Sequence, residues 1–186
     1  MARSLTTRAV AVVLFSLAAT LAAHNGSAAP RQDDQGGDAI RPRILRVRGA
    51  DQRARSLLQE GASRSGTFRG LLEALDRSDV IVYLETGPLD RPGALLFVSS
   101  GGARFLRILV RASGRPDDEV IAWIGHELQH AVEISATPDV KDDNGVLRLF
   151  RRIGFTSRST CETKEAERVW RRVLDEVRYG ARCGHR

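Results

Sequence analysis

The stretch WIGHELQHAV, residues 123–132, holds the side chains of this chain best suited to bind a metal ion and do chemistry with it. His126 and His130 are four positions apart, so in a helix they lie on one face and can reach the same ion. Glu127 is rotated toward the neighbouring face, where its carboxylate can take a proton from a water that the ion activates without binding the ion itself. The spacing therefore predicts a hydrolytic metal site on a helix.

This His-Glu-x-x-His pattern is typical of zinc peptidases, and neutral imidazole is a ligand that zinc favours. The alternative is an ordinary core helix in which two histidines happen to be four apart. The context favours the metal, because the pattern lies within a convincing helix, directly after a predicted strand, in a chain that looks exported. We therefore expect Zn²⁺ as the cofactor.

A third protein ligand has to come from elsewhere in the chain. Glu133 shares the histidine face, but it lies seven residues after His126, about 10.5 Å along the helix axis, which is too far to share one ion. We expect Glu133 at the surface or in contact with a ligand. The better candidate is Glu162, near the start of the predicted last helix.

Glu162 falls in line with the apolar stripe of that helix, so its carboxylate is expected to face inward. A buried carboxylate is costly unless it meets a cation, and this predicts Glu162 as the third metal ligand. The alternative is a capping box, in which Ser159 and Glu162 only hold the start of the helix. The stripe consists of Ala166, Val169, Val173 and Val177.

The remaining elements predict an α+β fold, with strands grouped between helices. A helical stretch over 51–79 is broken around Gly61–Gly66, with Thr67 as the expected N-cap of its second half. The motif helix is expected from RPDDE to about Ser135, and it is followed by a short basic helix and a closing helix over 161–179. Strands are expected at 42–48, 80–85, 94–100 and 103–112, the last two forming a hairpin.

HELQH followed by a glutamate on a separate helix resembles the gluzincin type of zincin, and IGHELQHAVEI with ETKEA is similar to small secreted bacterial zincin-like proteins that are largely uncharacterised. The resemblance implies a zincin-like fold with a small antiparallel or mixed sheet packed on the motif helix. It also implies zinc held by His126, His130 and Glu162, with Glu127 as general base. A peptide or protein substrate would pair with the 94–112 hairpin.

The chain departs from the gluzincin pattern in one respect. An aspartate that orients a histidine usually follows the glutamate ligand by four residues, but Ala166 occupies that place here. Another group must then orient the imidazoles, and Glu165 is one candidate. This departure favours an alternative function, a non-catalytic, zinc-stabilised secreted binding module. A secreted interaction protein that binds no metal is a further alternative.

The N-terminal sequence predicts three regions: a signal peptide over 1–29, a disordered leader over 30–41 and a metallopeptidase domain over 42–186. Cleavage near Ala28 or Ala29 implies a secreted or periplasmic protein without a stable membrane span. The chain has 29 Lys+Arg and 23 Asp+Glu, a formal net charge of +6. Because these charges are dispersed and few aromatic residues lie among them, we expect no nucleic-acid partner. The oligomeric state is left open.

Cys161 and Cys183 would lie in an oxidising compartment, where a disulfide would be natural. A helix over 161–179 is about 27 Å long, and the four residues after it cannot bring the second cysteine back. We therefore expect two unpaired thiols or an intermolecular bond.

Overall fold

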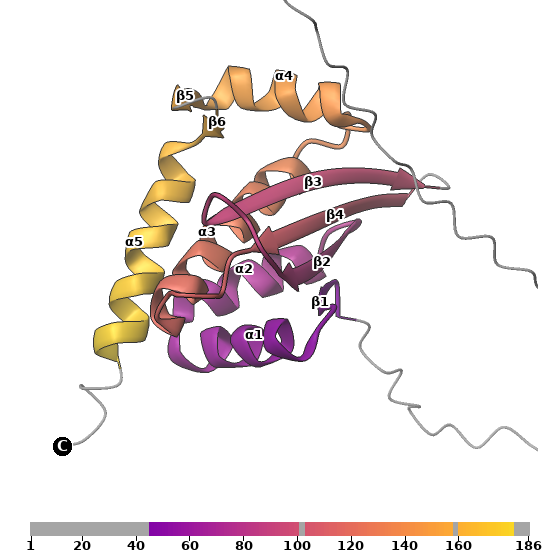
Figure 1. Cartoon of the computed structure of the whole chain (residues 1–186). Coiled ribbons are helices and arrows are strands. Elements are labelled where there is room, and N and C mark those ends of the chain that lie inside the picture. Colours follow the sequence, from indigo (N-terminus) through magenta and orange to yellow (C-terminus); the bar gives the residue numbers. More distant parts are fainter. Residues whose placement is uncertain (1–44, 101–102, 158–159, 181–186) are drawn as a thin grey trace, which may run out of the picture. The chain divides into compact units, whose positions relative to one another are not determined.

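The computed structural model describes residues 45–100, 103–157 and 160–180, and within them the chain is α+β (Figure 1). The predicted α+β class is thus confirmed. The described elements form five helices, a four-stranded sheet and a separate two-stranded sheet. In chain order they are β1 (Val47–Gly49), α1 (Gln52–Arg64), α2 (Gly66–Asp76), β2 (Val80–Thr86), β3 (Gly93–Ser100), β4 (Ala103–Val110), α3 (Asp117–Ser135), α4 (Asp143–Ile153), β5 (Phe155–Ser157), β6 (Thr160–Glu162) and α5 (Lys164–Tyr179).

The larger sheet is mixed and has the order β1-β2-β4-β3. Strands β1, β2 and β4 are parallel, whereas β3 returns antiparallel to β4 as the expected hairpin. This order leaves β3 at one edge of the sheet, where one side of its backbone has no partner strand within the described residues. The free edge of β3 borders the candidate site described below.

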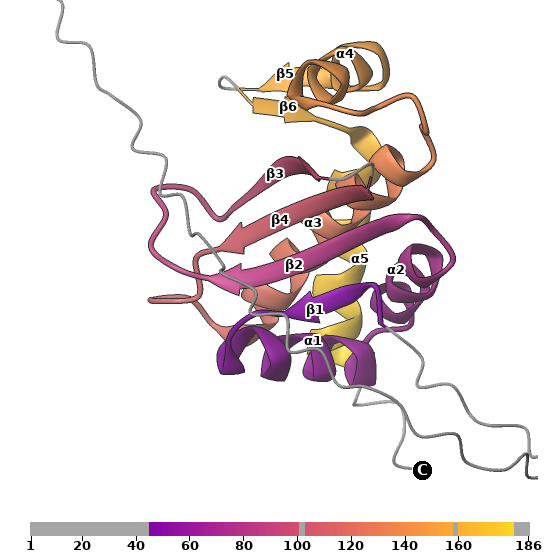
Figure 2. The ribbon, with the colours of Figure 1, turned by 90° about the vertical axis from the view of Figure 1, so that its right-hand side faces the viewer.

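The sheet buries one face against the helices (Figure 2). Side chains alternate along a strand, and in β4 Leu106, Ile108 and Val110 are fully buried while Arg107 is exposed. Figure 2 shows α3 and α5 behind the strands. The apolar face predicted for this strand is therefore the face that packs on α3, the helix that carries the two histidines.

Arg104 joins the sheet to the C-terminal end of α3, a role that no sequence pattern predicted. Its side chain is 2% exposed, and its guanidinium donates to the carbonyls of Ile134 and Thr137 at 3.0 Å each. Its Nε donates to Asp79 at 2.8 Å, and this hydrogen bond holds the pKa of Asp79 below its ordinary value. A positive charge suits the negative end of a helix, so Arg104 caps α3 and fixes its position on β4.

Two predicted helix starts were wrong. Helix α2 is capped by Ser65, whose Oγ accepts from Phe68 N at 2.9 Å, and not by Thr67. Thr67 is in the first turn of α2, and its backbone N and Oγ1 donate to Glu176 of α5. The carboxylate of Glu176 thus joins the start of α2 to α5.

The start of the closing helix was also placed too early. Thr160–Glu162 pairs with β5 as strand β6, and α5 begins at Lys164 with Thr163 as its N-cap. Because Thr163 Oγ1 accepts from Ala166 N at 3.1 Å, Thr163 is the N-cap and Glu162 precedes the helix, whereas Ser159, the other residue of the predicted capping box, lies outside the described residues. Of the strand predicted at 42–48, residues 42–44 also lie outside the described residues, and the described part forms a strand at Val47–Gly49.

Several predictions concern parts of the chain outside the described residues. These are the signal peptide, the leader, Cys183, and the side chain of Cys161. No helix among the residues that the structure describes is both long and apolar enough to cross a membrane.

Glu176→Gln is expected to lower the free energy of unfolding at neutral pH by about 1–2 kcal/mol, because hydrogen bonds to a charged group are lost. Burial raises the pKa of Glu176, but the hydrogen bonds from Ser65 and Thr67 outweigh it and lower the pKa from 4.5. The carboxylate therefore stabilises the fold fully above pH 4.5, and this contribution is lost as pH falls through the folded-state pKa.

Urea denaturation of wild type and Glu176→Gln at several pH values measures this effect. The difference between them should shrink below pH 4.5, and Glu167→Gln on the same helix serves as the control. A difference that stays constant with pH would contradict the role given to the carboxylate.

Candidate metal centre

Helix α3 holds the motif residues in a buried position. His126, Glu127 and His130 are only 4%, 7% and 5% exposed. The helix can approach α5 closely because residue 125 is glycine: a Cβ there would lie 3.1 Å from Val173 Cγ2. Three ionisable side chains of α3 are thus buried, and in their charged forms they need partners of opposite charge.

His126, His130 and Glu162 come together and form a group that could hold a metal ion. The two Nε2 atoms are 3.2 Å apart, and Glu162 Oε2 lies 2.9 Å from that of His126 and 3.8 Å from that of His130. One ligand atom from each residue lies within 4.8 Å of the others. The three predicted ligands therefore converge on one point.

The geometry of Glu162 fits an ion between these atoms better than a direct pair. Although Glu162 Oε2 is close to His126 Nε2, it is buried and makes no hydrogen bond. A short distance without a hydrogen bond is expected when two atoms point toward a shared cation and not toward each other. Two imidazoles and one carboxylate are also a ligand set suited to zinc and neighbouring transition metals.

Glu162 reaches the site from a strand, although the sequence argument placed it on a helix. It is the last residue of β6, immediately before Thr163, the N-cap of α5. Strand β6 lies next to the N-terminal end of α5 (Figure 1), and Glu162 Oε2 lies 2.9 Å from Nε2 of His126. Glu162 thus belongs to the group that could hold an ion, but the helix predicted at this position is a strand.

Glu133 orients one of the two imidazoles. Its Oε2 lies 2.9 Å from Nδ1 of His130, and its Oε1 accepts from Thr163 Oγ1 at 2.7 Å. Metal-binding histidines commonly donate their second ring nitrogen to a carboxylate in this way. Glu133 therefore contacts His130, one of the three candidate ligands, which is one of the two positions expected for it from the sequence. Glu165, the earlier candidate, instead forms an exposed pair with Arg168.

His126 has no comparable support, because its Nδ1 is buried without a hydrogen-bond partner among the described residues. Its ring packs edge-on against Trp123, with centroids 5.1 Å apart. The two imidazoles thus differ: one is held by a carboxylate and the other by an aromatic ring.

Glu127 lies beside the three ligands and is not one of them. Burial raises the pKa of Glu127, although the neighbouring histidines act in the opposite direction. Its carboxylate packs against Gly93 at the start of β3, where any Cβ would collide with Glu127 Oε1. The glycine therefore makes room for a buried carboxylate between the helix and the edge strand.

The charges of the group show how strongly it attracts a cation. Burial favours the neutral ring of His130, but contacts with Glu133 and Glu162 outweigh it and raise the pKa of His130 to about 9. Burial also raises the pKa of Glu162, yet the two histidines outweigh this and hold it well below its ordinary value. The carboxylates that favour a proton on His130 would also favour a cation bound between the three side chains.

A cleft of about 310 Å³ opens over the metal centre. The start of β3 forms one wall and α4 forms the other, with the two histidines, Glu127 and Glu162 between them. The wall residues are Arg91, Gly93, Ala94 and Leu95 on the strand side and Asp143, Val146, Leu147 and Phe150 on α4. The candidate site is therefore accessible from solvent along the sheet edge.

Comparison of the chain with protein-family models, with curated proteins and with solved structures gives no match. The interpretation of the site therefore depends on its own geometry and chemistry.

We expect the purified protein to bind one divalent ion per chain, and His126→Ala and Glu162→Ala to abolish this binding. Glu133→Gln should weaken it about 10- to 100-fold, because His130 loses the group that orients it. Titration against a chromophoric chelator measures these affinities.

Glu165→Gln is the matched control, since it removes the same charge nearby from a side chain that does not touch the site. Wild-type affinity in Glu162→Ala would remove this residue from the ligand set.

Proposed function

We propose that this protein is a zinc-dependent peptide hydrolase with a zincin-like site. The observation that carries the proposal is Glu127, a buried carboxylate next to a three-ligand group to which it contributes no ligand atom. Three protein ligands are the usual set of a catalytic zinc, which keeps one position open for water or substrate. A purely structural zinc would be expected to have a fourth protein ligand.

When bound, zinc would activate a water molecule and polarise the carbonyl of the peptide bond. His126, His130 and Glu162 would hold the ion. Glu127 would accept the proton of the attacking water and pass it to the departing amine, so that it ends the cycle ionised again. Its raised pKa suits the first step, because it makes the carboxylate a stronger base; in the second step the proton passes on because the departing amine is far more basic than a carboxylate.

The edge strand β3 supports a peptide as the substrate. Its outer side has no partner strand among the described residues, and its first residues line the cleft over the candidate metal centre. An extended peptide could add to this edge as a further strand, with its carbonyls carried past the site. Together with the predicted signal peptide, this suggests a secreted or periplasmic enzyme that acts on peptides or proteins.

A second function, a non-catalytic zinc-stabilised binding module, is favoured by the environment of His126. Ala166 has no side chain that could accept from this imidazole, and Nδ1 has no partner among the described residues. In this alternative the ion would stabilise the fold, and β3 would bind a partner segment without cleaving it. Measured turnover separates the two functions.

Glu127→Gln is expected to lower kcat by about 10²–10⁴-fold, because it removes the proton acceptor while leaving the ligands in place. Gly93→Ala should have a similar effect, since its Cβ would displace the same carboxylate. Both variants should keep wild-type zinc affinity.

Cleavage of a mixed-sequence peptide library by the zinc-loaded protein, followed by mass spectrometry, measures this activity. Gly70→Ala is the control for the glycine substitution, because no atom lies within 4 Å of the added Cβ. Zinc binding without cleavage in wild type would favour the binding module.

A further inference from the structure

A second pocket borders the metal centre on the side of α5. It has a volume of about 310 Å³, and it shares His126 and Glu162 with the cleft. Its other lining residues are Trp123, Glu167, Trp170 and Arg171. A ligand bound at the metal can therefore extend in two directions, into the cleft beside β3 or into this pocket.

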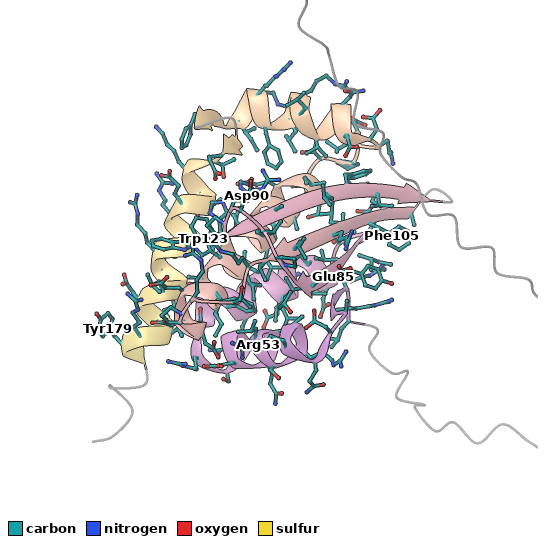
Figure 3. All side chains as sticks on the ribbon, viewed as in Figure 1. Arg53, Glu85, Asp90, Phe105, Trp123 and Tyr179 are labelled. Atoms are coloured by element: carbon teal, nitrogen blue, oxygen red, sulfur yellow. The ribbon has the colours of Figure 1, made fainter. Side chains whose placement is uncertain are left out.

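The pocket is formed largely by an aromatic pair. Trp123 of α3 and Trp170 of α5 have ring centroids 5.6 Å apart at an angle of 49°, and both are half-buried (Figure 3 labels Trp123 beside α5). The chain contains 2 tryptophans in all, so both of them line this pocket. Half-buried tryptophans next to a reactive centre offer a large aromatic surface to a third ring.

Two buried N–H donors without acceptors lie in the same group of residues. Trp170 Nε1 and His126 Nδ1 are two of the four buried side-chain atoms in the described part of the chain that make no hydrogen bond. When Nε2 of His126 binds a metal, Nδ1 carries the proton and needs an acceptor. Both nitrogens are buried, however, so an occupant of the open pocket does not reach them, and its recognition depends on the pocket surface.

The charges at the rim argue against a cationic occupant. Glu167 already lies 3.8 Å from Arg171, and both side chains are largely exposed. The nearby metal ion and Arg171 would both repel a second positive charge. The surface left for recognition is the indole pair.

We propose that this pocket, which we call the tryptophan pocket, is a specificity subsite that takes an aromatic side chain of the substrate next to the bond to be cleaved. This inference rests on the proposed peptide hydrolysis and adds to it the residue type that is preferred. Trp123 and Trp170, which both line the pocket, bind the ring. The cleft beside β3 holds the other side of the peptide.

The test uses amino-acid hydroxamates, which bind zinc through their own chelating group and differ only in the side chain. The zinc-loaded wild-type protein is titrated by calorimetry with the hydroxamates of phenylalanine, alanine and lysine. We expect phenylalanine hydroxamate to bind about five- to tenfold more tightly than alanine hydroxamate. Trp170→Leu should abolish this preference, so that phenylalanine and alanine hydroxamates bind with similar affinity.

The matched control is Tyr179→Leu, which removes an aromatic ring from the same helix outside the pocket and should keep the preference. A second readout needs no variant. Because both tryptophans line the pocket, phenylalanine hydroxamate should shift the intrinsic fluorescence of wild type, and alanine hydroxamate should not.

The outcomes separate the inference from the function on which it rests. Equal binding of all three hydroxamates would overturn the subsite and leave the zinc centre in place. Tighter binding of lysine hydroxamate would overturn the aromatic preference. Failure of every hydroxamate to bind the zinc-loaded protein would count against the proposed function itself and remove the basis of the subsite.

Discussion

Helix α3 has to be buried and charged at the same place, and most of the structure follows from this constraint. It packs against the sheet and against α5, yet its centre carries two imidazoles and a carboxylate. Such groups are stable in an interior only when charges of opposite sign surround them. Glu133 and Glu162 provide the negative charges, and an ion bound between the ligands would provide the positive one. Binding of an ion at this place would thus also meet an electrostatic requirement of the core.

The same constraint explains why the position of α3 is fixed at several points. Arg104 holds its C-terminal end against β4, and Gly125 lets α5 come close to its middle. Gly93 leaves room for Glu127 at the edge of the sheet. A group built from side chains of α3 and β6 needs both elements to be held in register, because a small displacement of either would separate the atoms that come together there. These contacts are therefore part of the site even though they touch no ligand.

The sequence was informative wherever a periodic pattern carried the signal. Strands β2, β3 and β4, the motif helix and the shared face of His126 and His130 could be predicted, because burial imposes spacings of two and of about four residues. It failed where one side chain decides the local structure. Ser65 and Thr67 are both common caps by type, and both hydroxyls donate to Glu176; they differ because only Ser65 Oγ accepts from Phe68 N. Glu162 was expected on a helix and is the last residue of β6, yet its Oε2 lies 2.9 Å from Nε2 of His126.

The position of Glu162 has a further consequence for folding. Both histidines belong to α3, whereas Glu162 lies beyond α4 and β5, so an ion held by all three would close a loop over residues 131–161. Closing a loop of this length removes entropy from the unfolded chain, as a disulfide would, but reversibly. Because Phe150 of this loop packs on His130, the free concentration of the metal would control the stability of one wall of the cleft. The ion would then act as a removable cross-link, and its supply would determine when the cleft is complete.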